Sequence, residues 1–268
     1  MMTATKDNAE ELSYSVYDMR QRDEVQKTTL EMRASLLSQG HKFRYQDGAW
    51  TPVSYPGVSV VSMVDYDGDN MALHASLCDI QSRLEQEAGL PSALYMLPPD
   101  SFHQTVANTF SADRYEQHIV RAGLVDTYPQ LLQRAFEEIH VVPCEKPIEM
   151  RLIGLSLFRT AIGLLGVFPD VQDFERVLQF RNGLYGHSDL QAIGLQCTRP
   201  FIGHITLAYI EGVLSDASCR RLVDVIAELN AEIEQSDLTF RIYETEPRWY
   251  DHLASFEKRP DYPLYSFV

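Results

Sequence analysis

The sequence predicts an α+β fold made of two lobes, each a mostly antiparallel sheet with helices on its outside. Strand and helix patterns follow one another in a similar order in the two halves of the chain. Each half also carries one His-x-Thr triplet within a strand pattern, beginning at His103 and at His204. No short-period repeat is present, so the similarity of the halves lies in the element order and in these two triplets.

Length and composition are those of an ordinary globular protein that can bury a large core in its 268 residues. No apolar run is long enough to cross a membrane, and the first residues are polar and acidic, so we expect neither a membrane span nor a signal peptide. The four cysteines lie far apart and form no Cys-x-x-Cys pair. We therefore expect free thiols and a cytoplasmic location.

The formal net charge is −15, from 23 Lys and Arg against 38 Asp and Glu. Such a balance opposes non-specific binding to a long polyanion. If the substrate is a phosphate ester, the charge favours a small nucleotide or one RNA end held in a pocket, and we expect no long duplex as a partner.

The first 40 residues are predicted to form a segment outside the main domain. Residues 1 to about 12 resemble a disordered tail, and Asp18 to Gln39 have the pattern of one helix that ends before Gly40. We take residues 1–40 as a tail with an extra helix outside the core, and residues 41–268 as a single bilobal domain.

The first half of that domain is predicted as a turn, strand, helix and two further strands, followed by two helical pieces. The turn is Gln46-Asp47-Gly48, where Asp-Gly favours a tight reversal. The following elements are expected at residues 58–64 (strand), 71–88 (helix, stopped by Gly89), 93–96 (strand), the His103 strand, and 113–140 (two helical pieces broken near Gly123 to Thr127).

The second half repeats the scheme with changes. A hairpin comes first, then a helix, the His204 strand, a helix that begins with the cap-type residues Ser215 and Asp216, and a last strand. Their expected bounds are 148–158, 161–168, 170–184, 199–210, 215–234 and 238–243. The tail from Trp249 to Val268 is aromatic and polar, and its pattern predicts no definite element.

The two triplets bring an imidazole and a hydroxyl together. Residues i and i+2 of a strand share a face, so His103 lies beside Thr105 and His204 beside Thr206. Histidine titrates near neutral pH and can act as a base or an acid, and a threonine hydroxyl can donate a hydrogen bond to a phosphate oxygen. Two such strands facing one cleft would form a symmetric acid and base pair.

One triplet alone would mean little, because threonine is common in strands. The flanking residues add to the signal. The stretch Leu97-Pro98-Pro99-Asp100-Ser101-Phe102-His103 and the stretch from Arg199 to Ala208 resemble the two motif regions of the two-histidine (2H) phosphoesterase superfamily, which includes RNA ligase-like and cyclic phosphodiesterase-like proteins. The segment from Lys42 through Asp65 resembles a bacterial branch of that superfamily with an extended N-terminus. The resemblance runs from about residue 41 to 245.

Two positions depart from the pattern of this superfamily. Gly203 stands before the second histidine where proline is frequent, which we expect to alter only the entry of the strand. Gln104 is polar where relatives often have an apolar residue. If Gln104 faces the core it needs a hydrogen-bond partner, and we expect the strand to be less buried on that side.

The resemblance implies a pseudo-symmetric fold with a cleft between two lobes, and a phosphodiester or cyclic phosphate bound there without a metal or other cofactor. His103, Thr105, His204 and Thr206 are the catalytic residues it implies. The sequence does not decide which histidine is the base. We take His204 as the base toward water and His103 as the acid toward the leaving ribose oxygen.

Further substrate contacts are expected from arginine and aromatic side chains. Arg199, Arg151, Arg159 and Arg248 are candidates for a phosphate clamp, of which we expect one or two in the site, with Arg199 and Arg151 preferred. Tyr250 is the aromatic residue we select for substrate binding among those near the C-terminus, although packing in the core explains such residues equally well.

Metal binding is disfavoured. The remaining histidines lack a matched context, and no carboxylate or cysteine stands at a ligand spacing from the two triplets. The run Asp65-Tyr66-Asp67-Gly68-Asp69 resembles the start of a calcium loop but lacks the closing glutamate, so we expect a solvated turn.

The predicted function is therefore a metal-independent phosphodiesterase acting on a 2′,3′-cyclic phosphate or another small nucleotide or RNA-end phosphodiester. Two alternatives remain open: a catalytically silent nucleotide-binding sensor or scaffold of the same fold, and an enzyme that joins or trims RNA 2′-5′ ends. The N-terminal helix and the loop 111–127 are candidates for a lid.

Overall fold

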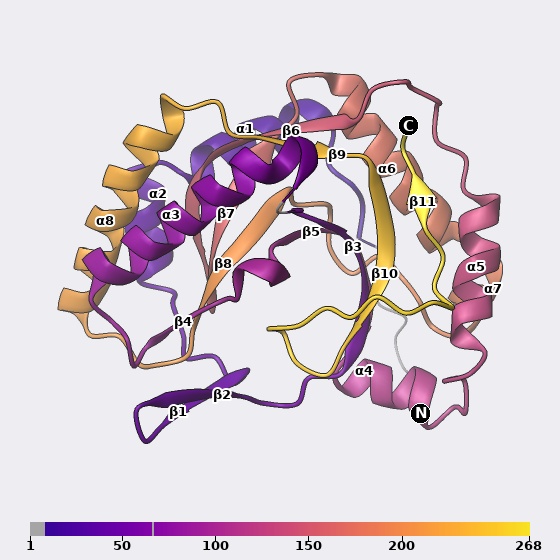
Figure 1. Cartoon of the computed structure of the whole chain (residues 1–268), viewed down its shortest axis with the longest axis horizontal. Coiled ribbons are helices and arrows are strands. Elements are labelled where there is room, and N and C mark those ends of the chain that lie inside the picture. Colours follow the sequence, from indigo (N-terminus) through magenta and orange to yellow (C-terminus); the bar gives the residue numbers. More distant parts are fainter. Residues whose placement is uncertain (1–8, 66) are drawn as a thin grey trace.

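The computed structural model describes residues 9–65 and 67–268 and shows one long, curved sheet flanked by helices (Figure 1). The strands follow the order β11-β10-β3-β5-β8-β7-β6-β9, and β4 pairs with β8. Every pair is antiparallel. The bounds are β3 Gly57–Met63, β4 Leu94–Met96, β5 His103–Ser111, β6 Ile148–Phe158, β7 Ala161–Val167, β8 His204–Ile210, β9 Thr239–Ile242, β10 Glu244–Tyr250 and β11 Tyr265–Ser266.

The sheet divides into two lobes at its centre. β5 and β8 are neighbours through one residue pair, Gln104 and Ile205, whereas the strands within each lobe pair over longer stretches. The predicted α+β fold with two antiparallel lobes is thereby confirmed, with the addition that the two sheets are continuous at this junction. The β1–β2 hairpin (Phe43–Gln46 and Ala49–Pro52) forms a separate two-stranded sheet around the predicted Asp47-Gly48 turn.

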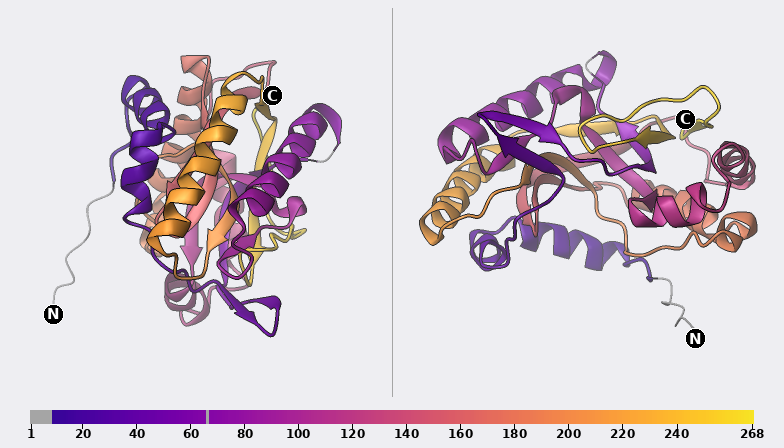
Figure 2. Two further views of the ribbon diagram at one scale, coloured as in Figure 1. Left: turned by 90° about the vertical axis from the view of Figure 1, so that its left-hand side faces the viewer. Right: turned by 90° about the horizontal axis from the view of Figure 1, so that it is seen from below.

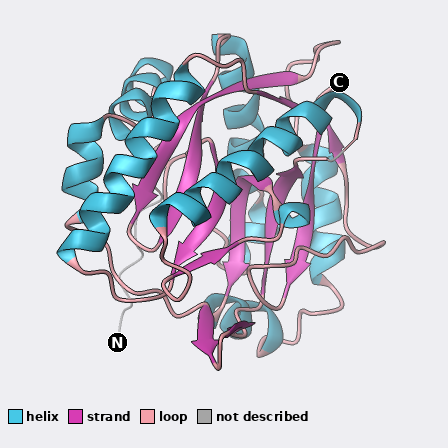
Figure 3. Cartoon of the chain, turned by 60° about the vertical axis from the view of Figure 1, so that its left-hand side comes forward, coloured by secondary structure: helices cyan, strands magenta, loops and turns pink. Residues whose placement is uncertain are grey.

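Helices cover both sides of the sheet (Figure 3). α3 and α1 lie on opposite sides of the lobe that contains β6, β7 and β8, with α2 beside α1 (Figure 2). The helix bounds are α1 Tyr14–Glu24, α2 Lys27–Ala34, α3 Met71–Ala88, α4 Asp113–Tyr115, α5 Tyr128–Glu138, α6 Val171–Gly186, α7 Ser188–Ala192 and α8 Asp216–Glu234; short turns of other helical types occupy Gly68–Asn70, Pro99–Ser101 and Glu116–Val120. In the described residues, none of these helices combines the length and the apolar composition needed to cross a membrane.

The prediction of one N-terminal helix outside the core is wrong. The chain forms two helices because Gln26, between them, adopts an extended conformation. Tyr17 of α1 and Leu30 of α2 are both completely or almost completely buried in the main core. Of the predicted disordered tail, residues 1–8 lie outside the described residues, whereas Glu11 is anchored by an ion pair of 2.6 Å to Arg181. The division into residues 1–40 and 41–268 remains a prediction.

Gly203 is explained by α1. A Cβ atom at this position would overlap the Tyr17 hydroxyl and would come within 2.8 Å of the Met150 sulfur. The Tyr17 hydroxyl donates a hydrogen bond of 2.6 Å to the carbonyl of Gly166, and Gln21 donates one of 2.8 Å to the carbonyl of Gly203. The first helix therefore packs directly against the entry to the second motif strand.

Besides the two strands that flank the predicted Asp47-Gly48 turn, the strands β10 and β11 and the short helix α7 were absent from the prediction. β10 contains Pro247 and several charged residues, so it lacks the alternation typical of a strand. It pairs with β3 over five residues, and β11 covers only Glu244 and Thr245 on its other side, which leaves Pro247 next to a free edge. α7 has only five residues and gives no periodic signal.

Candidate functional site

The two His-x-Thr strands lie side by side at the centre of the sheet. Cross-strand partners point to the same side, so the Gln104 and Ile205 pair defines one face and the flanking residues define the other. His103, Thr105, His204 and Thr206 all belong to this other face, which we call the catalytic face. The structure therefore brings the four residues together on one surface, and their catalytic role stays a prediction.

Both histidines are held in the same way. The His103 Nδ1 atom lies 2.7 Å from the carbonyl oxygen of Ser101, and the His204 Nδ1 atom lies 2.9 Å from that of Ile202. In each case the partner is two residues earlier in the chain. Because a carbonyl only accepts, each Nδ1 must carry the proton, and each Nε2 is left to exchange a proton with a substrate.

Burial keeps both imidazoles neutral. It lowers the pKa of His103 to about 4, with a smaller contribution in the same direction from the positive charge of Arg248. It also lowers the pKa of His204 to about 4, helped by the charges of Arg199 and of His103. In both cases the carbonyl that accepts from Nδ1 acts in the opposite direction. A negatively charged ligand between the two rings would raise both pKa values.

Each motif strand contains a β-bulge immediately after its threonine. Along β3, Val61 pairs with Thr105 and Val60 with Ala107, so Val106 is extra. Along β7, Gly163 pairs with Thr206 and Ile162 with Ala208, so Leu207 is extra. These bulges shift the alternation by one residue.

The shift brings two further side chains onto the catalytic face, Asn108 of β5 and Tyr209 of β8. They occupy equivalent places, three residues after each threonine. Sequence reasoning missed both, because strict alternation puts them on the opposite face. The matching sequences His-Gln-Thr-Val-Ala and His-Ile-Thr-Leu-Ala are the signal that could have pointed to them.

Gln104 links the two motifs, and it is completely buried rather than partly exposed as expected. Its side-chain oxygen accepts a short hydrogen bond from the backbone N–H of His204. Its side-chain nitrogen lies 2.7 Å from the Thr105 carbonyl and 3.2 Å from the Ile202 carbonyl, the same carbonyl that holds the His204 ring. The polar side chain is therefore satisfied, and it fixes one motif against the other.

The first lobe supplies a wall to the catalytic face from β10. The register of β10 and β3 places Glu246, Arg248 and Tyr250 on this face. The Tyr250 hydroxyl lies 3.2 Å from the Ser59 hydroxyl, and burial raises the pKa of Tyr250 to about 12. Arg248 is paired with Glu246, which is also 2.8 Å from Lys258. Much of the charge of Arg248 is thus compensated.

The segment that follows β10 packs against the His103 ring through Phe256. The ring of Phe256 lies 4.1 Å from the His103 ring and 4.9 Å from the Tyr250 ring, centroid to centroid. Arg248 donates a hydrogen bond of 3.2 Å to the Phe256 carbonyl.

Two cations lie close to His204 and Tyr209. Arg199 donates a hydrogen bond of 3.3 Å to the side chain of Asn108, and its charge lowers the pKa of His204. The Lys42 ammonium lies 4.6 Å from the ring centre of Tyr209 and 5.5 Å from that of Tyr55. Burial lowers the pKa of Lys42, and neither cation has a carboxylate within 4 Å among the described residues.

The other predicted arginines fall in different places. Arg159 follows Phe158, whose ring is 5.1 Å from that of His204. Arg151 sits near the far end of β6, opposite Val167 and Thr239, and lines a separate hollow beside Lys27 and Asn230. The structure therefore brings Arg199, Arg248 and Tyr250 to the motif residues and places Arg151 away from them.

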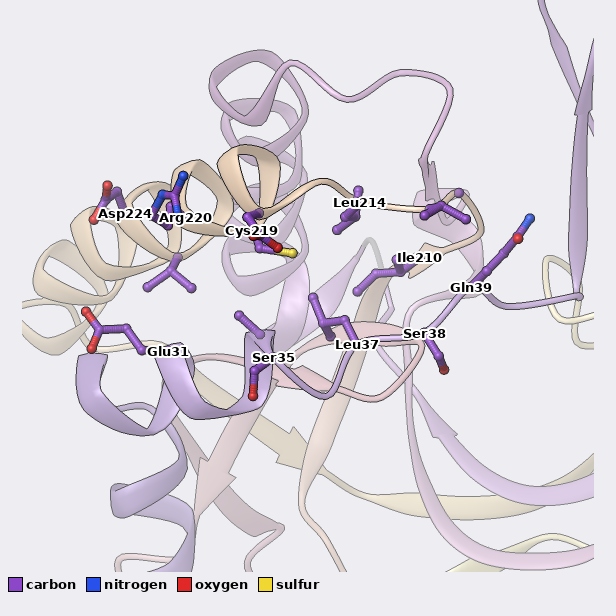
Figure 4. A pocket seen from close by; sticks show the side chains of 15 residues that line it. Glu31, Ser35, Leu37, Ser38, Gln39, Ile210, Leu214, Cys219, Arg220 and Asp224 are labelled. Atoms are coloured by element: carbon purple, nitrogen blue, oxygen red, sulfur yellow. The ribbon is translucent and has the colours of Figure 1, made fainter.

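A cavity of about 510 Å³ lies between α2 and α8, away from the motif residues. Leu37, Ile210 and Cys219 are among the residues that line it, and none of the motif residues does (Figure 4). Within residues 9–65 and 67–268, no three His, Cys, Asp or Glu side chains gather closely enough to hold a metal ion. Of the calcium-like run, residue 66 lies outside the described residues.

One family model matches part of this chain. Residues 44–159 match the family model 2H-phosphodiest, described as a domain of unknown function (DUF1868). The matched segment includes the first motif and ends before the second. No curated protein matches the chain.

Solved structures resemble the fold. A conserved protein of unknown function from Agrobacterium tumefaciens superposes with a TM-score of 0.59 and 15% identity, over 81% of this chain and 88% of the other. A protein from Thermus thermophilus (TM-score 0.44, 14% identity, 78% and 97% covered) and a structure named phosphoesterase (0.43, 11%, 80% and 98%) are also similar. The family match over residues 44–159 shows that this part of the chain is similar to the two-histidine (2H) phosphodiesterases, and the Agrobacterium structure is similar in fold.

Proposed function

We propose that this protein is a metal-independent phosphodiesterase that hydrolyses a 2′,3′-cyclic phosphate or another small nucleotide or RNA-end phosphodiester. The similarity of residues 44–159 to the 2H phosphodiesterase family supports phosphoesterase activity in general. The observation that carries the finer proposal is the pair of histidines on one face, each with Nδ1 bound to a carbonyl and Nε2 left for proton transfer.

The proposed reaction is a direct displacement at phosphorus. One neutral imidazole accepts a proton at Nε2 from water as the water oxygen forms a bond to phosphorus. The bond from phosphorus to the ribose oxygen breaks, and that oxygen receives a proton from Nε2 of the other histidine, which begins as the imidazolium. The two rings end with exchanged protonation states, and proton exchange with solvent restores them. We assign His204 as the base and His103 as the acid.

The hydroxyls and cations assist this displacement in the proposal. Thr105 and Thr206 flank the two rings and donate hydrogen bonds to the non-bridging oxygens, where negative charge increases in the transition state. Arg199 lies close enough to His204 to influence its pKa and supplies positive charge for the same oxygens. Tyr250 lines the first lobe's side of the site, with its hydroxyl beside Ser59.

The test is phosphorus NMR of the EDTA-treated protein with 2′,3′-cyclic nucleotides, comparing the wild type with His204→Ala. We expect the wild type alone to convert the cyclic phosphate to one monophosphate. No conversion, with nucleotide signals broadened by binding, would contradict the proposal and support a silent nucleotide-binding protein. Turnover confined to RNA ends, with a steep loss as salt is added, would instead support an enzyme that trims or joins RNA ends.

A further inference from the structure

A second cavity lies beside His204 beneath the N-terminal helices. It has a volume of about 490 Å³ and is lined partly by Leu165, the cross-strand partner of His204, and by Ile202, whose carbonyl holds the His204 ring. Phe158 also lines it, with its ring 5.1 Å from that of His204. Leu165 and Phe158 point to the catalytic face by the register of β6, β7 and β8, so this part of the lining continues the surface of the motif histidines, although none of the motif residues lines the cavity itself.

The roof of this cavity comes from α1 and α2, and it is basic. Arg20 and Gln21 of α1 and Arg33 of α2 line it together with Arg159, from the turn after β6. Arg33 is neutralised by Glu24. Arg20 and Arg159 have no carboxylate within 4 Å in the part of the chain that the structure describes, and the only side-chain partner of Arg159 there is Ser38, at 3.3 Å.

The chemistry of the lining fits one kind of ligand. Leu36, Leu165 and Ile202 give the cavity an apolar surface. The guanidinium groups of Arg20 and Arg159 give it a local positive charge, although the formal net charge of the chain is −15. Guanidinium groups bind phosphate oxygens through paired hydrogen bonds. A nucleotide that extends from the scissile phosphate could pack against the apolar side chains and place a further phosphate beside the two guanidinium groups.

We propose that Arg20 and Arg159 form a subsite for a second phosphate of the substrate, which makes the preferred substrate a phosphodiester that carries a further phosphate group rather than a plain cyclic mononucleotide. This inference rests on the proposed function for the site of cleavage. It also gives the N-terminal helices a role in recognition, because α1 and α2 supply most of the roof.

Binding of product-like ligands tests the subsite without requiring turnover. Calorimetry compares adenosine 3′,5′-bisphosphate with adenosine 3′-monophosphate on the wild type, the Arg20→Gln/Arg159→Gln double variant and an Arg220→Gln control. Arg220 is exposed and lines the other cavity. We expect the wild type and the control to bind the bisphosphate about tenfold more tightly, and the double variant to show a ratio close to one.

A ratio near one in the wild type, an unchanged ratio in the double variant, or no binding of either ligand to the wild type would overturn the inference. Arg159→Glu serves as a second variant, and it should weaken bisphosphate binding more than Arg159→Gln does. Because both arginines are exposed, their replacement should leave the thermal unfolding midpoint unchanged. A wild type that prefers the bisphosphate but converts no cyclic phosphate would contradict the proposed function and not the subsite.

Discussion

At the scale of single residues, Gln104 is the side chain on which the alignment of the two motifs depends. It accepts from the backbone N–H of His204 and donates to the carbonyl that holds the His204 ring. We expect Gln104→Leu to lower kcat about tenfold or more, because the His204 ring is then less well oriented. It should also destabilise the fold by about 1 to 3 kcal/mol, because the His204 N–H and the Thr105 and Ile202 carbonyls lose this hydrogen-bond partner.

Steady-state kinetics and denaturant unfolding would measure both effects of Gln104→Leu. Gln104→Glu is the comparison variant, since it keeps the acceptor oxygen for the His204 N–H and loses the donor to the Thr105 and Ile202 carbonyls. An unchanged kcat in Gln104→Leu, with unfolding as expected, would show that the link stabilises the fold without positioning the base.

The lowered pKa values of the two histidines predict an unusual pH dependence. The proposed hydrolysis needs one ring protonated and the other neutral, and both pKa values are about 4 in the free protein. Above that pH both rings are neutral, so kcat/KM should fall as the pH rises from about 5 to about 8. A bound phosphodiester anion raises the pKa values, so kcat should decline only at higher pH. Profiles of kcat and kcat/KM that decline together would contradict this account.

At the scale of elements, strands and helices with strong periodicity could be predicted from the sequence. Which side chains these elements bring to the site could not be predicted in the same way. The bounds of β6 agree with the prediction, and α3 and α8 lie within a residue of theirs, because their alternating or helical apolar patterns are clear. The two bulges leave no periodic signal, so strict alternation places Asn108 and Tyr209 on the wrong face, and only the matching sequences around the two triplets point to them. The apolar pattern of residues 18–39 indicated a helix but not the surface that it covers.

Burial of the N-terminal helices gives an element-scale prediction. Leu30 of α2 is completely buried, whereas Met32 on the same helix is 55% exposed. Leu30→Ala should therefore destabilise the protein by about 2 to 5 kcal/mol, and Met32→Ala should change the unfolding free energy by less than about 0.5 kcal/mol. Equal effects of the two substitutions, measured by urea unfolding, would mean that α2 is not part of the cooperative core.

At the scale of the whole molecule, a strongly acidic chain presents a few cations at the site where an anion is expected. Lys42 and Arg199 lie near Tyr209 and His204 without a carboxylate partner in the described residues, while Arg248 on the facing lobe is paired. This distribution suits a small anionic ligand. For a cyclic mononucleotide we expect kcat/KM to fall only a few-fold between about 50 and about 200 mM salt, because few phosphates are engaged. A loss of about a thousand-fold would indicate a long nucleic acid contact instead.

Both histidines are held by a carbonyl two residues earlier in the chain, and we propose that one acts as the base and the other as the acid of a single reaction. The most direct measurement is kcat for a 2′,3′-cyclic nucleotide in His103→Ala, His204→Ala and the double variant, each checked for an unchanged fold. We predict that each single variant loses about a thousand-fold or more and that the double variant loses little beyond that, because the two rings act as a unit. Wild-type turnover in either single variant would contradict the claim.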